Sequence, residues 1–318
     1  METPLAGVNR TLLMPLWGRA KATRAGSRIL SDPAAVAVVE RLDLDLRDLD
    51  RTLHPSNELF TIARARALDD IARGFLSRHA AATVINLGAG LDTAFHRVDD
   101  GRAAWFDVDL PAVIDLRQRL IPPTERTRRV AGSILEPGWV REVTPRPAAV
   151  LCLASGLLAY FRACHIRKLL AILAAAFPGG ELAFDVQSPA TNLFGNRRLR
   201  ASGMGEARFR WGAFSAAAVR RLCPQLEILE SFAIFAKLAR DDFASERDWR
   251  MARSMDRMRA MWLVHARLPR QPGSSPGDDG AADHRHVVPR AEDALDQPMD
   301  PGSQRSGSRR TRFRSAPA

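Results

Sequence analysis

The chain has 318 residues, of which 46% are hydrophobic and 26% charged, and its formal net charge is +11 at pH 7. These values are those of an ordinary soluble globular protein with one large or two small domains. The charge would suit nucleic acid, but the arginines are scattered and no zinc-finger or RNA-binding signature accompanies them, which disfavours that partner.

The sequence also disfavours a membrane protein and a metal-binding protein. No run approaches the roughly 20 apolar residues of a transmembrane helix, so we expect no membrane span. The three cysteines (Cys152, Cys164 and Cys223) lack the spacing of a metal site and cannot all pair. We therefore expect no metal and a reduced, cytoplasmic protein.

The first 56 residues are expected to form a helical extension. Helical periodicity covers residues 12–25 and 32–41, and Asp32 followed by Pro33 is a typical helix start, with an N-cap and proline at the first position. Residues 57–79 predict a long amphipathic helix, because apolar residues recur there at helical spacing.

From residue 83 onward, short apolar runs alternate with helical segments. This alternation predicts an α/β fold, a doubly wound and mostly parallel Rossmann-like sheet with helices on both faces. The predicted strands are 83–87, 104–108, 128–131, 148–153 and 181–186, with a later edge strand within 226–236. The predicted helices between them are 111–120, 137–143 and 164–177.

The carboxyl-terminal part divides into three predicted segments. Residues 188–224 are an insertion at the carboxyl edge of the sheet, where loops carry function. Residues 243–266 are expected to be helical, with a Met and Trp stripe used for packing. Residues 269–318 are rich in Gly, Pro, Ser and Arg without apolar periodicity, which predicts a disordered tail. The folded domain therefore spans 57–268.

Residues 83–93 read TVINLGAGLDT and contain the most informative motif. A buried strand that ends in Gly88 and Gly90 turns sharply into a helix, and glycine allows a ligand to approach the backbone. The next strand ends in Asp107 and Asp109, and an acid there can accept both ribose hydroxyls of an adenosine. The two segments together predict a nucleoside cofactor site. The alternative is a tight turn without a ligand.

The motif favours S-adenosylmethionine over NAD. A dinucleotide loop has a third glycine where this chain has Thr93, and the lysine of a phosphate-binding loop is absent. Asp92 would repel a pyrophosphate but not the ammonium group of an amino-acid tail.

Several separated segments also carry a family resemblance. They are residues 12–20, 29–36, 84–93, 105–111, 156–160, 177–182 and 207–212. The sequence over about residues 8–236 resembles the leucine carboxyl methyltransferase family, and within it the bacterial branch of polyketide synthesis. The resemblance implies a class I S-adenosylmethionine-dependent methyltransferase domain. It also implies transfer of a methyl group to a carboxylate or hydroxyl of a small polyketide-like or acidic aromatic metabolite.

The resemblance also implies roles for individual residues. The cofactor's methionine part would approach the backbone of Gly88, Ala89 and Gly90. Asp109 matches the ribose-binding acid, with Asp107 as the alternative. For the cofactor carboxylate, Arg64 matches one basic residue, and Arg24 or Lys21 the other. Ser133 and Ile134 fall where the family contacts adenine.

One position departs from the family pattern. Where the family commonly has a glutamate before the Gly-x-Leu-x-Tyr segment, this chain has Ser155, which can form a hydrogen bond but supplies no charge. Ala94 likewise replaces a common arginine. These differences leave open a catalytically weakened relative that acts through partner binding, and an NAD-dependent oxidoreductase is a more distant alternative.

Residues for the acceptor and for catalysis are less well defined. Arg208, Arg210 and Trp211 would stack on a ring and pair with an acidic oxygen, or else form an edge strand with a solvated face. Tyr160 would point into the cleft, and His96 and His165 are general-base candidates by location alone. A carboxylate acceptor, already ionised at neutral pH, would need no base.

Overall fold

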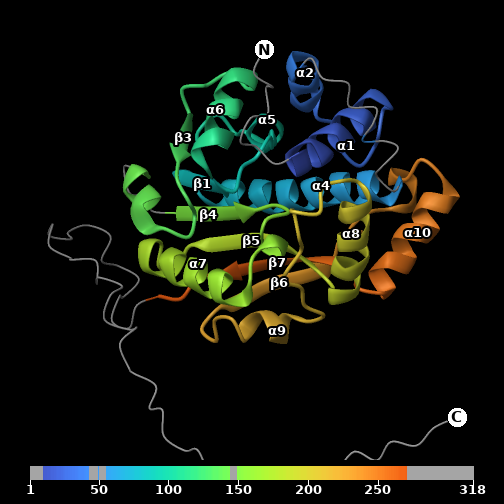
Figure 1. Cartoon of the computed structure of the whole chain (residues 1–318). Helices are drawn as coiled ribbons and strands as arrows, with labels where there is room; N and C mark the ends of the chain where they lie inside the picture. Colours follow the sequence, from blue (N-terminus) through green and yellow to red (C-terminus); the bar gives the residue numbers. More distant parts are fainter. Residues whose placement is uncertain (1–9, 43–48, 50–54, 144–148, 271–318) are drawn as a thin grey trace, which may run out of the picture. The chain divides into compact units, whose positions relative to one another are not determined.

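The computed structural model describes residues 10–42, 49, 55–143 and 149–270. Its centre is a seven-stranded sheet in the order β3-β2-β1-β4-β5-β7-β6 (Figure 1). The first five strands in the chain pair in parallel, whereas β7 is antiparallel to both β5 and β6. The strands are β1 (Ala82–Leu87), β2 (Ala104–Asp109), β3 (Thr127–Ala131), β4 (Ala149–Ala154), β5 (Glu181–Gln187), β6 (Glu227–Ala233) and β7 (Met261–Arg267).

The predicted fold class is confirmed. Each of the five predicted parallel strands is present with bounds within one residue of the prediction among the described residues, and β6 forms the expected edge strand. Strands β1 and β5 are buried along their whole length, as expected for a sheet covered on both faces.

The helix predicted over residues 243–266 is wrong in its second half. Helix α10 (Glu246–Arg257) ends at a turn in which Arg259 has a left-handed φ of 48°. Strand β7 follows and lies between β5 and β6. Its backbone pairs with both neighbours and its apolar side chains are buried in the clusters on the two faces of the sheet. Such a short run of apolar residues fits a strand or a helix equally well. The Met and Trp stripe therefore divides between a surface helix and the sheet.

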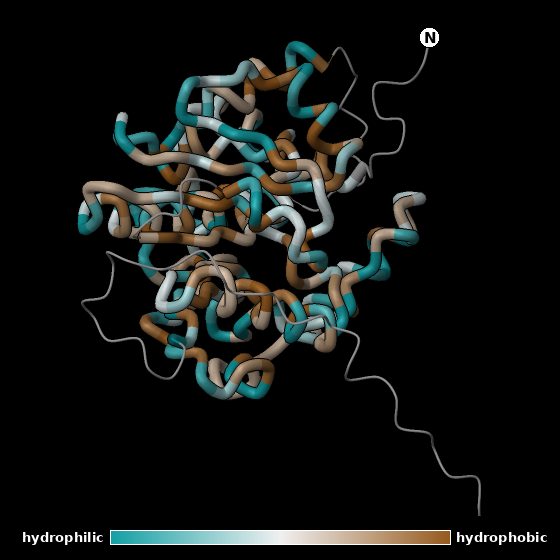
Figure 2. The backbone as a smooth tube through the Cα atoms, turned by 90° about the vertical axis from the view of Figure 1, so that its left-hand side faces the viewer, coloured by the Kyte–Doolittle hydropathy of each residue, from teal (hydrophilic) through white to brown (hydrophobic). Residues whose placement is uncertain are grey.

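Helices cover both faces of the sheet, and the strands alternate between two apolar clusters. On one face, Val84 and Leu151 pack with α4 (Pro55–Arg78), α5 (Ala94–Val98) and α10. On the other face, Ile85 and Cys152 pack with α7 (Ala163–Ala176) and α9 (Ala216–Arg220). Figure 2 shows the apolar stretches of backbone running through the middle of the fold. This alternation on opposite faces is the doubly wound arrangement that the sequence predicts.

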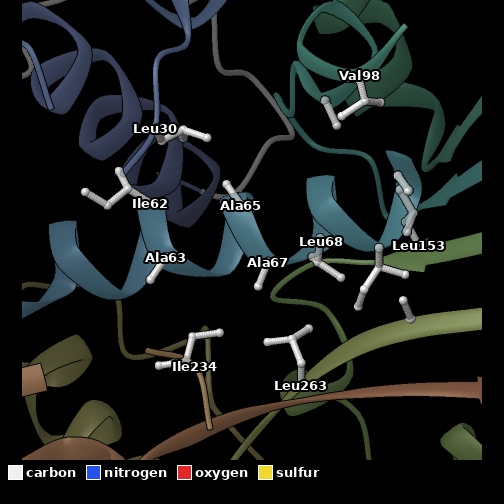
Figure 3. Close-up of a cluster of buried hydrophobic side chains, with 14 of the residues drawn as sticks. Leu30, Ile62, Ala63, Ala65, Ala67, Leu68, Val98, Leu153, Ile234 and Leu263 are labelled. Atoms are coloured by element: carbon white, nitrogen blue, oxygen red, sulfur yellow. The ribbon is translucent and has the colours of Figure 1, made fainter. Parts of the chain in front are cut away.

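Helix α4 packs on two layers at once. Ile62 and Ala65 point toward Leu30, which precedes α2, whereas Ala63 and Ala67 point toward the sheet (Figure 3). The small alanines let the helix lie close to the strands. A third apolar cluster joins α1 (Leu13–Arg24), α2 (Pro33–Leu42) and α6 (Pro111–Leu120). Asp32 caps α2 as predicted, because its Oδ1 accepts the N–H of Ala35 at 2.9 Å.

The remaining elements are short apart from one helix. They are η1 (Arg10–Leu12), η2 (Pro137–Glu142), η3 (Leu158–Tyr160), α8 (Pro189–Ala201) and η4 (Arg240–Asp242). Helix α8 and α9 occupy the predicted insertion. The predicted tail lies outside the described residues except for its first two positions, and the domain limits stay predictions. None of the described helices is long and apolar enough to span a bilayer.

Candidate cofactor and acceptor site

The order of strands reverses at β1, which lies between β2 and β4. From β1 the chain proceeds through β2 to β3 on one side, and β4 leads to β5 on the other. In open α/β sheets, the crevice outside the carboxyl ends of the strands at such a point binds the ligand. The loop that follows β1, residues 88–93 (the glycine loop), and the segment that follows β4 meet there.

The glycine loop has the backbone conformation that glycine permits. Gly88 and Gly90 have φ values of 60° and 49°, both in the left-handed region. A Cβ on Gly88 would lie 2.5 Å from Leu157, and one on Gly90 would lie 2.9 Å from Leu12. Two leucines therefore pack on the loop, and a ligand that approached along those faces would have to displace them.

Arg117 holds the glycine loop from behind. This buried side chain of α6 donates from Nη1 to the carbonyl oxygens of Gly90 (2.9 Å) and Asp92 (2.8 Å), and from Nη2 to the Asp107 carboxylate (2.5 Å). Because carbonyls of the loop are turned toward Arg117, the loop is fixed to the core. Sequence patterns do not reveal this residue, since nothing distinguishes one arginine of α6 from the many others in the chain.

The two acids of β2 have different surroundings. Asp107 is buried and accepts hydrogen bonds from Asn86, Trp105 and Arg117. Asp109, in contrast, accepts the N–H of Gly90 at 2.7 Å, so its carboxylate faces the glycine loop. Burial raises the pKa of Asp109 above its ordinary 3.8, although hydrogen bonds from Gly90 and Leu110 oppose this effect. Of the two alternatives, Asp109 is the one whose carboxylate contacts the glycine loop.

Asp92 belongs to a network of buried ions. Arg97 forms ion pairs with Asp69 and Asp32 (both 2.7 Å) and with Asp92 (3.3 Å), and Arg19 also pairs with Asp32 at 2.9 Å. Burial acts to raise the pKa of Asp92, but the charges of Arg97, Arg19 and Arg117 lower it overall. Its carboxylate therefore already has cationic partners, and the network anchors the end of the glycine loop.

A second carboxylate, that of Asp185 in β5, lies beside the end of the neighbouring strand β4. It is buried, and its Oδ1 accepts the N–H of Gly156 at 2.5 Å. Its Oδ2 lies 3.5 Å from Nη1 of Arg64, a long ion pair, and the buried Nε of Arg64 has no hydrogen-bond partner. Asp185 stands beside Ser155, the position where the family pattern has a glutamate.

A cavity of about 1030 Å³ adjoins this point. Arg64, Gly156 and Tyr160 line it, and Lys21 lines it while paired with Glu58 at 3.2 Å. Its apolar lining includes Met14, Trp17, Phe60, Phe194, Phe209 and Met255. Leu157, the chain neighbour of the cavity residue Gly156, packs on Gly88 of the glycine loop. The cavity is large enough for an acceptor of several rings.

Tyr160 faces the cavity as predicted. Burial raises the pKa of its hydroxyl above the ordinary value of 10.0, while the charge of Arg64 and a hydrogen bond with Thr11 oppose the shift. The hydroxyl therefore stays protonated near neutral pH. It can donate a hydrogen bond but is a poor general base.

The other predicted residues have different surroundings, and Ile134 is buried in the apolar cluster of the sheet. Ser133 and Ile134 follow β3, beside the tip of β2, where Gly132 donates to the Asp109 carbonyl at 2.8 Å. Arg24 is exposed and pairs with Glu40, so the alternative, Lys21, is the one that lines the cavity. His96 is exposed on α5 and lines a smaller cavity of about 540 Å³.

In the predicted acceptor segment, the side chains that face the cavity are not the expected ones. Arg208 and Arg210 are exposed, and Trp211 packs against the apolar cluster of the sheet. Phe209, which lies between the two arginines, lines the cavity instead. The segment forms no strand, so the alternative of an edge strand is not observed. His165 lies in the first turn of α7, where its ring contacts Phe161.

No group of three or more metal-ligating side chains gathers anywhere in the described part of the chain. The polar groups that do gather suit an adenosyl cofactor with an amino-acid tail. Asp109 supplies an acceptor for hydroxyls, and the guanidinium of Arg64, which lines the cavity, suits a carboxylate.

Comparison with known proteins gives concordant results. The leucine carboxyl methyltransferase family model matches residues 12–174. Over 233 residues (72% of this chain and 84% of the relative), the sequence is 34% identical to the tetracenomycin polyketide synthesis O-methyltransferase TcmP of Streptomyces glaucescens. It is 30% identical over 232 residues (66% and 76%) to the S-adenosyl-L-methionine-dependent methyltransferase dpfgK of Gibberella zeae. The crystal structure of a DUF574 family protein from Streptomyces avermitilis has the same fold, with a TM-score of 0.51, 16% identity, and 79% and 97% of the two chains covered.

Proposed function

The chain belongs to the leucine carboxyl methyltransferase family and is an O-methyltransferase, and we propose that it methylates a carboxylate or phenolic oxygen of a small acidic aromatic metabolite, with S-adenosylmethionine as donor. One observation carries the cofactor part of this proposal. The carboxylate at the tip of β2 meets the amide of the glycine loop at the point where the strand order reverses. That combination would offer an acceptor for hydroxyls next to the backbone of the glycine loop, once Leu157 and Leu12 move aside to admit the ligand.

Individual residues of the chain then have distinct tasks in binding the donor. Asp109 would accept the ribose hydroxyls, and Ser133 and Ile134 would border the adenine. The guanidinium of Arg64 would pair with the cofactor carboxylate, and the side chain of Lys21 is near enough to the same cavity to assist. Asp185 would keep Arg64 and the Gly156 amide in place.

The bound cofactor supplies an activated methyl group on a sulfonium, which leaves by in-line displacement. The protein's contribution is to align the acceptor oxygen and to exclude water. The largely apolar cavity that Gly156 and Tyr160 line would serve both purposes. A carboxylate acceptor needs no proton removed at neutral pH, whereas a phenol would have to lose one. Because burial raises its pKa, the Tyr160 hydroxyl stays protonated and would serve as a hydrogen-bond donor to the acceptor rather than as a base.

Calorimetry and methyl uptake test the proposal together. We expect S-adenosylmethionine and S-adenosylhomocysteine to bind, and NAD not to bind. A screen of aromatic carboxylic acids and phenols, with a mass increase of one methyl group as the readout, should then identify acceptors. Binding of NAD alone would refute the proposal. Tight cofactor binding without methyl uptake would instead favour the weakened relative that Ser155 suggests.

A further inference from the structure

Phe209 lies in a segment that is held from both sides although it forms neither helix nor strand. On one side, Asn196 of α8 donates from Nδ2 to the Phe209 carbonyl at 2.9 Å and accepts the Phe209 N–H on Oδ1 at 2.8 Å. On the other side, the N–H groups of Arg210 and Trp211 donate to the carbonyl of Ala159 at 2.7 and 3.1 Å. The Asn196 side chain thus bonds both the N–H and the carbonyl of Phe209, as the backbone of a neighbouring strand would. These bonds fix the direction of the ring.

That direction is into the cavity. A Cβ on Gly195 would lie 2.8 Å from Cε2 of Phe209, so the glycine lets the ring lie directly against α8. The ring centroid is 4.9 Å from that of Tyr160, with the planes inclined at 41°. Both rings line the cavity, and the flanking Arg208 and Arg210 are exposed because side chains alternate along an extended segment.

We propose that Phe209 and Tyr160 form an aromatic wall on which a planar ring of the acceptor lies, and that Asn196 is the positioning residue of this wall. The inference rests on the proposed function and adds the selection rule for the substrate. Aromatic rings prefer tilted or offset contacts at centroid distances of roughly 4.5–7 Å, which a third ring can extend. A saturated ring of the same size is thicker and lacks the charge distribution of an aromatic face. The wall therefore selects aromatic over alicyclic acids.

The residue that would contact the acceptor ring is Phe209, whereas the sequence pattern suggests Trp211. Trp211 packs in the apolar cluster of the sheet, and its carbonyl accepts from Asn192 at 2.7 Å. It is a support for the segment rather than a surface for a ligand. The stacking residue is the phenylalanine two positions earlier.

Direct binding of two matched acids tests the wall. The probes are 2-naphthoic acid and its fully saturated analogue, decahydro-2-naphthoic acid, measured by calorimetry on the full chain. We expect the wild-type protein to bind the aromatic acid more tightly. Phe209→Leu keeps the apolar volume but removes the ring, and should weaken binding of the aromatic acid about five- to tenfold. Binding of the saturated acid should change less than about twofold, and Phe209→Tyr should restore the preference.

Asn196→Ala should lower the same preference by a smaller factor, because the ring remains but its direction is no longer fixed. Phe214→Leu is the matched control, since Phe214 is 53% exposed and is not part of the cavity lining. Thermal unfolding of each variant verifies that it is folded. Equal binding of the two acids by the wild-type protein, binding of neither acid, or equal losses for both in Phe209→Leu would overturn the wall. An unchanged preference in Asn196→Ala would overturn its positioning role.

The same titrations separate this inference from the proposed function. S-adenosylmethionine affinity should be equal in the wild type, Phe209→Leu and Asn196→Ala. If the wild type binds the aromatic acid selectively but not the cofactor, the methyl-transfer proposal fails and the wall stands. If it binds the cofactor but does not distinguish the acids, the wall fails and the methyl-transfer proposal stands.

Discussion

The carboxylate of Asp109 accepts the backbone N–H of Gly90 at 2.7 Å, which joins the tip of β2 to the loop that follows β1. The two residues come from the two segments of sequence that together predict an adenosyl pocket. Their contact places the acid beside the glycine that a nucleoside must approach. The neighbouring Asp107 instead forms an ion pair with Arg117, so the two acids of β2 have different partners.

Replacing Asp109 by alanine should weaken binding of S-adenosylmethionine by about 2–3 kcal/mol, because hydroxyls that donate to a charged group would lose their partner. This corresponds to roughly 30- to 150-fold in the dissociation constant, measured by calorimetry. Asp115→Ala, an exposed aspartate of α6, is the control and should leave affinity unchanged. An affinity equal to wild type in Asp109→Ala would contradict the assigned role.

Cofactor affinity should also depend on pH through Asp109. Burial raises the pKa of this carboxyl above 3.8, so it takes up a proton at a higher pH than an ordinary aspartate as the solution is acidified. The protonated form is a weaker acceptor, and affinity should fall as pH decreases through that raised pKa. Calorimetry at a series of acidic pH values should show the fall in the wild type and a flatter profile in Asp109→Asn. A profile of equal slope in the two proteins would count against this explanation.

Replacing Arg97 by methionine should strongly destabilise the fold. Its guanidinium is buried between Asp69, Asp32 and Asp92, and its removal leaves carboxylates in the interior without their main counter-charge. Breaking such a buried set costs about 3–5 kcal/mol. Urea unfolding measures the loss. The matched control is Arg102→Met, whose exposed pair with Asp100 should contribute no more than about 1 kcal/mol. Equal losses in the two variants would show that the buried network is not special.

Local patterns predicted the parallel strands and the glycine loop because each depends on a few consecutive residues. Strand β7 was not predicted, since Met261 and Trp262 continue the apolar spacing of α10 and only the neighbouring strands decide their conformation.

The residues that complete the site were missed for a related reason. Arg117, Asp185 and Asn196 act on partners that are between 10 and 121 residues away in the sequence, and tertiary packing alone brings them together. The arginine and aromatic residues at 208–211 did indicate a possible acceptor-binding segment. The pattern could not show which side chains point inward, because that depends on the hydrogen bonds from Asn196 and to Ala159.

Glu181 lies at the end of the sheet opposite the cofactor crevice, and its ionisation should make the free energy of unfolding depend on pH in the acidic range. This carboxylate begins β5, where it lies 2.7 Å from His265 Nε2 and 3.1 Å from Arg78. Burial acts to raise its pKa, but the hydrogen bond with His265 and the charges of His265, Arg78 and Arg267 lower it overall below 4.5. Because the folded-state pKa is depressed, the stabilisation is fully present above the unfolded value near 4.5. It is lost as pH falls through the lower folded value.

Unfolding free energy measured by urea between pH 7 and pH 3 tests this effect. Glu181→Gln should be less stable than wild type at pH 7, and its stability should fall less steeply below about pH 4.5, so that the two curves converge in acid. Glu246→Gln is the control, because Glu246 pairs with Arg240 and Arg250 on the surface, where solvent screens the charges, and it should produce a smaller difference. Cofactor affinity at pH 7 should be unaffected, since Glu181 lies at the amino end of its strand. Parallel curves for wild type and Glu181→Gln would show that this carboxylate keeps its ordinary pKa in the folded protein.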